Sequence, residues 1–125
     1  MTSNEKAAEL LRRYAVGERS FRRLELDDGV YDLRNAKLSD ADFTGSFIVA
    51  DFRGADLRNA DFANTNVKTC DFRGADLSGA NFKGAALDAA EFDGARMSDT
   101  KFIGAFIYGH ELKEHERPYG ACQAL

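Results

Sequence analysis

The sequence has no tryptophan, one proline and two cysteines in 125 residues, and its formal charge at pH 7 is -4. Electrostatic binding to nucleic acid needs a basic surface that displaces counterions from the phosphates, so we expect no direct nucleic-acid ligand. No apolar stretch approaches the ~20 residues that a membrane-spanning helix needs. The first sixteen residues contain Glu5 and lack an uninterrupted apolar core. They therefore do not resemble a secretory signal, and we expect a cytoplasmic protein.

The two cysteines, Cys70 and Cys122, leave two states open. Cys70 stands at a position that small residues occupy elsewhere in the chain. A reduced thiol at such a position behaves as a small hydrophobic side chain. We therefore favour free thiols, and a disulfide between the two residues is the alternative.

A five-residue period runs through most of the chain. From residue 50 the sequence divides into ADFRG, ADLRN, ADFAN, TNVKT, CDFRG, ADLSG, ANFKG, AALDA, AEFDG, ARMSD, TKFIG, AFIYG and HELKE, and the central residue of every pentad is apolar. Two residues before each centre stands a small residue, usually alanine, with Thr65, Cys70 and Thr100 as substitutes. Residues two apart in extended backbone point to the same side, so the small and the large residue share an inner face. Gly or Asn in the fifth position suits a tight corner, and the repeated alternation of extended piece and corner predicts a coil.

The repeated pattern A(D/N)(L/F)xx is the defining motif of the pentapeptide-repeat family, and residues 20–114 resemble that family. The resemblance implies an all-β fold, a right-handed quadrilateral β-helix with four pentads in each coil and about four to five coils. Short members without long loops are common in cyanobacteria, and many have no known role. The length of 125 residues fits a single domain.

Stacking every twentieth residue gives four columns of similar side chains. The first column is Leu33, Phe52, Phe72, Phe92 and Leu112; the second is Leu38, Leu57, Leu77 and Met97; the third is Phe43, Phe62, Phe82 and Phe102; the fourth is Ile48, Val67, Leu87 and Ile107. Alternation of Phe with other apolar residues would also fit two pentads in each coil. The step from Ile48 to Phe52 is four residues instead of five, so one corner residue is missing there.

Both ends depart from the period. Thr2 and Glu5 match a capping box, and the apolar residues that follow have helical spacing, which predicts a helix over residues 3–16. We expect this helix to cover the open end of the first coil. Before Leu33 the register is irregular. At the other end, residues 115–125 form a tail in which Pro118 and Tyr119 are expected to fold over the last coil.

Candidate catalytic and metal-binding residues are few. The segment HELKEH at 110–115 has its two histidines five residues apart, whereas zinc-protease helices need a spacing of four. We expect a charged end cap here, with a metal site formed with the nearby glutamates as the alternative. Both histidines lie in the last sixteen residues, and no phosphate-binding loop is found. We therefore expect no enzyme activity and no catalytic, cofactor or metal site.

A charged stripe follows the first column. The residues before its centres are acidic: Asp32, Asp51, Asp71, Glu91 and Glu111. The residues after its centres are mostly basic: Arg34, Arg53, Arg73, Asp93 and Lys113. Successive coils lie about 4.8 Å apart, so like charges would repel unless balanced. We expect a self-neutralising ladder of ion pairs, and a ligand site is the alternative.

Apolar residues face outward on the fourth column at Phe47 with Val49 and at Phe106 with Tyr108. Exposed aromatic residues can mark an interface. The simpler interpretation is that the helix and the tail dock on them.

Together these features predict a non-enzymatic scaffold for a protein partner, present as a monomer or a weak dimer. The candidate interaction surface consists of Asp51, Arg53, Asp71, Arg73, Glu91, Phe47, Phe106 and Tyr108. The alternative comes from the family resemblance, because some members mimic duplex DNA and bind DNA gyrase or a related topoisomerase. A rod of roughly 20–25 Å with mixed surface charge weakens this alternative.

Overall fold

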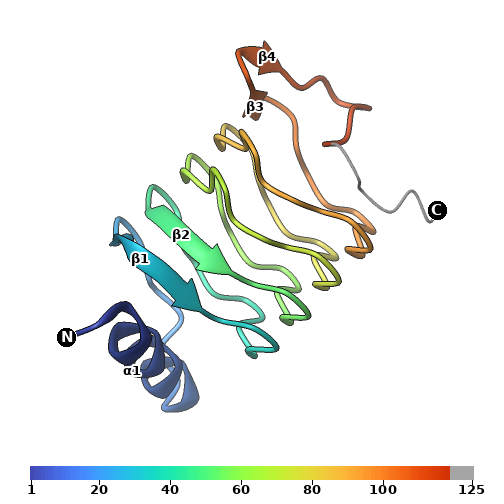
Figure 1. Ribbon diagram of the computed structural model, residues 1–125. Coiled ribbons are helices and arrows are strands. Elements are labelled where there is room, and N and C mark those ends of the chain that lie inside the picture. Colours follow the sequence, from blue (N-terminus) through green and yellow to red (C-terminus); the bar gives the residue numbers. More distant parts are fainter. Residues whose placement is uncertain (119–125) are drawn as a thin grey trace.

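The computed structural model describes residues 1–118 and shows a right-handed quadrilateral β-helix (Figure 1). Its elements are α1 (Ser3–Ala15), β1 (Glu25–Asp32), β2 (Phe47–Asp51), β3 (Phe106–Ile107) and β4 (His110–Glu111). Helix α1 lies at the N-terminal end of the stacked coils, and β3 and β4 lie at the opposite end. β1 and β2 pair in parallel, whereas β3 and β4 are antiparallel. The predicted fold class is confirmed.

The spacing of the coils follows from the parallel bridges between neighbouring coils. Asp51 pairs with Asp71, and Asp71 pairs with Glu91, at intervals of twenty residues. Four pentads therefore form one coil. For the pairs that span Val49 the interval is nineteen, as between Phe47 and Asn66. The missing residue lies in β2, where Val49 alone stands in place of the two turn residues found at regular corners.

The first coil contains a bulge. Leu26 of β1 pairs with Ile48 of β2, but the next pair is Tyr31 with Ala50. The four residues 27–30 therefore lie opposite the single residue Val49. This bulge accounts for the irregular register before Leu33, and α1 packs against the same strand.

The interior consists of stacked side chains with almost no solvent exposure. The phenylalanine rings at 52, 72 and 92 stack along one column with centroids 5.2 and 5.1 Å apart. A second stack contains the rings at 21, 43, 62, 82 and 102. Rings of the two columns meet edge to face, as Phe72 and Phe82 do at 5.5 Å. Each buried ring contributes on the order of 1.5–3 kcal/mol before the entropy of ordering it is counted.

Polar residues at the small inner positions are satisfied by backbone carbonyls of the preceding coil. Thr65 donates its hydroxyl to the Phe43 carbonyl at 2.8 Å, and Thr100 donates to the Leu77 carbonyl at 2.7 Å. The Cys70 thiol contacts the Ile48 carbonyl at 3.1 Å. Burial raises the pKa of this thiol to about 12, so it stays protonated and unreactive at neutral pH. Cys122, and with it the disulfide alternative, lies outside the described residues.

The last pentad, residues 110–114, does not form part of a further coil, which corrects the placement of Glu111, Leu112 and Lys113 on the first column. Tyr108 and Gly109 have φ angles of 49° and 80°. Two consecutive positive φ angles suit a tight hairpin turn, so the chain reverses. Glu111 then pairs with Phe106 of the fourth column instead of continuing below Glu91.

Helix α1 covers the N-terminal end of the solenoid, and β4 with the residues after it covers part of the C-terminal end. Helix α1 begins with the predicted capping box between Thr2 and Glu5 and buries Ala7 and Leu10. At the C-terminal end β4 pairs with the free edge of β3, and Leu112 and Pro118 are buried. The expectation for Tyr119 lies outside the described residues. Such covers reduce the unpaired backbone that would otherwise invite end-to-end association.

Candidate interaction surfaces

Each face of the solenoid takes the number of the inner column beneath it. The predicted charged stripe forms a ladder of ion pairs on the first face. We name the ladder the charged wall; its members in order are Asp32, Arg34, Asp51, Arg53, Asp71, Arg73 and Glu91. Each arginine contacts the carboxylate of its own coil at 2.6–2.9 Å. It also reaches the acid of the next coil at 3.1–3.9 Å. The ladder therefore joins four consecutive coils.

The local backbone fixes the position of each pair. Asp51 accepts a hydrogen bond from the backbone N–H of Arg53 at 3.1 Å, and Asp71 accepts one from Arg73 at 3.0 Å. This side-chain-to-backbone bond orients the carboxylate toward the guanidinium two residues later. The arginine side chains lower the pKa of both carboxyls, and Arg34 lowers the pKa of Asp32 to about 2. These three aspartates are therefore ionised at neutral pH.

The charged wall ends at Glu91. Asp93 stands where the preceding coils have arginine, and the chain reversal removes Glu111 from this face. The wall therefore holds four carboxylates against three guanidinium groups, which leaves one net negative charge. It is an alternating surface instead of an acidic stripe.

The outward aromatic residues of the fourth face remain accessible. The exposed fraction is 41% for Phe47, 43% for Phe106 and 71% for Tyr108. The prediction that α1 docks on Phe47 is wrong, because the helix packs against β1 and leaves this ring exposed. The tail up to Pro118 also leaves Phe106 and Tyr108 accessible. The rest of the tail lies outside the described residues.

Four further exposed large apolar residues were not among the predicted surface residues: Met1 and Val16, which flank α1, and Val30 and Ile103 in the coils. Val30 lies in the bulge of β1 and is 61% exposed, and Ile103 is 45% exposed. Val30 carries no pattern that would identify it, since the register is irregular there. Ile103 follows the centre of the pentad TKFIG, where polar residues usually stand, so the sequence did contain a signal.

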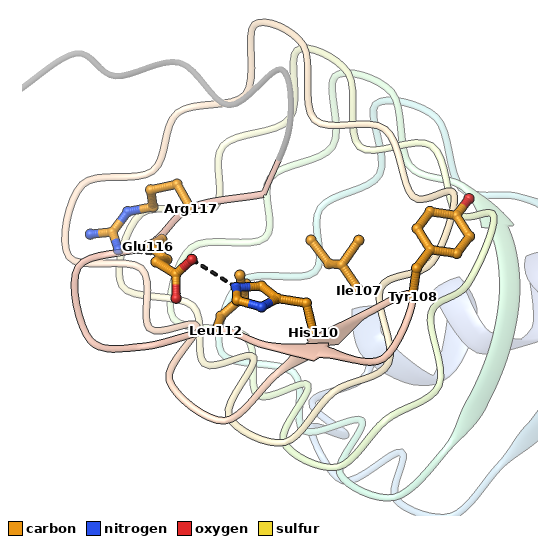
Figure 2. Close-up of a pocket in the computed structure, with 6 residues that line it drawn as sticks. All are labelled: Ile107, Tyr108, His110, Leu112, Glu116 and Arg117. Carbon is orange, nitrogen blue, oxygen red and sulfur yellow. Dashed lines mark hydrogen bonds and ion pairs between the residues drawn. The ribbon is translucent and has the colours of Figure 1, made fainter.

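A shallow pocket lies over the C-terminal end of the coils (Figure 2). Ile107, Tyr108, His110, Leu112, Glu116 and Arg117 line it. His110 Nε2 lies 2.8 Å from Glu116 Oε2, and the backbone N–H of Lys113 donates to the other carboxylate oxygen at 2.8 Å. These contacts lower the pKa of Glu116. The His110–Glu116 pair links β4 to the segment that follows it.

The described residues offer little for chemistry. His115 is not among the residues that line this pocket, so the two histidines of HELKEH do not meet there. Within residues 1–118 no group of three His, Cys, Asp or Glu side chains is placed to hold a metal ion. None of the helices in the same range is long and apolar enough to cross a bilayer.

Comparison with known proteins supports the repeat. The sequence matches the family of Pentapeptide repeats with eight copies over residues 50–74 and 70–107. A pentapeptide repeat protein of Nostoc Pcc 7120, alr5209, has a similar structure, with 28% identity, a TM-score of 0.54 and coverage of 88% of this chain and 87% of the other. The search among curated proteins gave no match.

Two other solved structures show weaker likeness. Rfr23, a pentapeptide repeat protein from the cyanobacterium Cyanothece 51142, is 20% identical with a TM-score of 0.47 and covers 80% of this chain and 94% of the other. QnrB1, a plasmid-mediated fluoroquinolone resistance protein, is 20% identical with a TM-score of 0.37 and covers 69% and 54%. The matched repeats end at residue 107, where the structure leaves the coil. The twenty-residue coil and the eight matched copies identify residues 50–107 of this chain as repeats of the pentapeptide-repeat family.

Proposed function

We propose that this protein is a non-enzymatic scaffold whose charged wall binds a protein partner. The single observation behind the proposal is the ladder from Asp32 to Glu91, in which every guanidinium contacts carboxylates of two coils. The ladder repeats at the spacing of the coils, about 4.8 Å. A partner with alternating charges at the same spacing would meet a complementary surface.

Rigidity supports a role in binding. The arginines are already held by two carboxylates each, so less side-chain entropy remains to be lost when a partner docks. Arg53 and Arg73 nonetheless keep 46% of their side-chain surface exposed, which leaves donors accessible. The backbone N–H and C=O groups of this face bond between coils, as the Phe72 N–H does with the Glu91 carbonyl at 2.8 Å. Recognition therefore rests on side chains.

The filled interior supports the absence of catalysis. The central residues of the columns are buried side chains that occupy the space inside the coils. The pocket in Figure 2 contains one histidine and one glutamate that already pair with each other. A catalytic site needs poised groups in a concave, water-excluding place. The described residues do not combine these features.

A quantitative pull-down with charge reversal tests the proposal. The three baits are the wild type, the wall variant Arg53→Glu/Arg73→Glu and the control variant Lys83→Glu/Lys101→Glu. The control variant changes the net charge by the same amount, but on the third face. We expect a partner that is retained by the wild type and the control but lost with the wall variant. Equal recovery of every partner by all three baits would refute the wall as the binding surface.

The duplex-DNA mimic remains the alternative prediction, and the arginines of the wall count against it. A mimic of the phosphate backbone needs a continuous row of negative charge. Here each aspartate of the wall is followed by an arginine, and only the last step, from Glu91 to Asp93, places two acids in succession. We expect no inhibition in a DNA gyrase supercoiling assay at micromolar protein, and clear inhibition would favour mimicry.

A further inference from the structure

The outward residues of the fourth face have the same chemical order in both directions along the rod. The bridge partners give the row Glu25, Phe47, Asn66, Ala86, Phe106 and Glu111. A glutamate stands at each end, a half-exposed phenylalanine stands next to it, and two small residues occupy the middle. The hairpin creates this symmetry, because it places Glu111 beside Phe106.

The same face has a second outward row. This row would also complement a second copy of itself that is turned end to end. The residues that follow the centres are Val49, Lys68, Asp88 and Tyr108. The outer two are a partly exposed valine and an exposed tyrosine, and the inner two carry opposite charges. Lys68 Nζ lies 3.8 Å from Asp88 Oδ2 within the chain, and their side chains are 46% and 26% exposed. Both retain surface for a contact with another molecule.

We propose that this fourth face binds a second copy of the chain, with the two rods antiparallel and the twofold axis parallel to the strands. This operation places Phe47 of each copy on Phe106 of the other and Asn66 on Ala86. It also places Lys68 on Asp88 and Val49 on Tyr108. A twofold interface uses the same patch on both subunits. The patch must therefore complement a second copy of itself that is turned end to end.

Several observations favour a second copy in this orientation. Of the seven large hydrophobic residues that are exposed among those described, Phe47, Phe106 and Tyr108 lie on this face. With the rods parallel, the twofold axis would run along the rod, so Lys68 would face Asn66 and Asp88 would face Ala86, and neither charge would meet an opposite charge. The two glutamates at the ends of the row face each other at the rim, where water and salt screen their repulsion.

The size of the face sets the strength of the dimer. Four coils at about 4.8 Å make a patch roughly 15–20 Å tall. Its area is well below the ~800 Å² for each partner that stable interfaces bury. The dimer is therefore weak and forms at high protein concentration. It is independent of any partner of the charged wall.

A charge-complementation experiment tests the pairing of Phe47 with Phe106. Phe47→Glu and Phe106→Lys are each expected to weaken self-association at least about tenfold, because each homodimer places two charges on apolar rings. A 1:1 mixture restores one pair of phenylalanines and adds one Glu–Lys pair, so heterodimers form. Ile103→Lys, on the third face, is the control and leaves self-association unchanged.

Sedimentation velocity from about 10 µM to about 1 mM measures the association, and circular dichroism confirms that each variant is folded. The proposal is supported if the wild type dimerises, both single variants are monomeric and the mixture dimerises. A wild type that stays monomeric throughout the range would overturn it. Folded single variants that dimerise like the wild type, or a mixture that stays monomeric, would overturn it as well.

Discussion

The first and the fourth face of the solenoid lie on the same coils but differ in their outward side chains. On the first face, arginines and carboxylates contact one another along the whole wall. On the fourth face, Phe47 and Phe106 remain about four-tenths exposed. The inner residues of both faces are buried, except for Ile107 at the C-terminal end of the fourth face, which is partly buried. In this fold the inner residues determine the coil. The outward residues can therefore differ in chemistry from one face to the next.

The largest loss of stability should come from removing a buried ring beneath the first face. The removal of an exposed ring on the fourth face gives the comparison. Phe72→Ala leaves a cavity in a stacked column and is expected to lower the free energy of unfolding by about 3–5 kcal/mol. Phe106→Ala removes a ring that is 43% exposed and should cost less than about 1.5 kcal/mol. Urea unfolding of dilute protein measures both. Equal losses of unfolding free energy would contradict the assignment of Phe72 to the interior and of Phe106 to the surface.

A smaller effect is expected at the corner that follows the first face. Gly54 has a φ of 67°, and the amide oxygen of Asn35 occupies the place of an added Cβ. Gly54→Ala should therefore destabilise by about 1–2 kcal/mol, because the left-handed φ is strained and the exposed end of the Asn35 side chain must move aside. Gly74, one coil later, has a similar φ of 69°, but the nearest atom to an added Cβ is 3.9 Å away.

Gly74→Ala is thus the matched control for backbone strain alone, and it should cost about 1 kcal/mol. The difference between the two variants in thermal or urea unfolding isolates the steric conflict with Asn35. The double variant Asn35→Ala/Gly54→Ala should recover part of the loss. No difference between Gly54→Ala and Gly74→Ala would contradict this description of the corner.

The smallest effect at neutral pH is expected from the charged wall itself. Arg53→Gln/Arg73→Gln should lower stability only slightly at pH 7, because exposed ion pairs are screened. The same change should alter the response to acid. The pKa of Asp32 is near 2 when folded, against a usual value of 3.8, and those of Asp51 and Asp71 are also lowered.

A lowered folded pKa contributes stability that is present above about pH 4 and is lost as the pH falls through the folded value. The wild type should therefore lose melting temperature between about pH 4 and pH 2. The double variant should lose less over this range, since Asp51 and Asp71 would have pKa values closer to normal. Identical acid profiles would show that the wall does not hold its carboxylates ionised.

The sequence was sufficient for the interior and for the wall. Each inner column follows from the five-residue period, because a buried centre tolerates only apolar residues of similar size. The alternation of acid and arginine on the first face follows from the same register. The missing corner residue was visible as a step of four between Ile48 and Phe52, although the extended path of β2 was not.

The chain reversal could not be predicted from the same pattern. Tyr108–Gly109 resembles the ordinary corners, in which any residue is followed by glycine. What differs is the positive φ of Tyr108, and tyrosine has no preference for that conformation. The pentad HELKE also keeps an apolar centre, and Leu112 is buried although it leaves the column. A residue can therefore satisfy the period and still lie elsewhere.

The twenty-residue coil also constrains how such a gene can change length. Inserting one pentad would keep every apolar centre buried but would rotate all later residues by a quarter turn. Phe106 would then move from the fourth face to the first, and the arginines after the insertion would lose their acidic neighbours. Duplicating a whole coil preserves every vertical neighbour. We therefore expect lineages that conserve the surface to gain or lose segments in steps of a full coil.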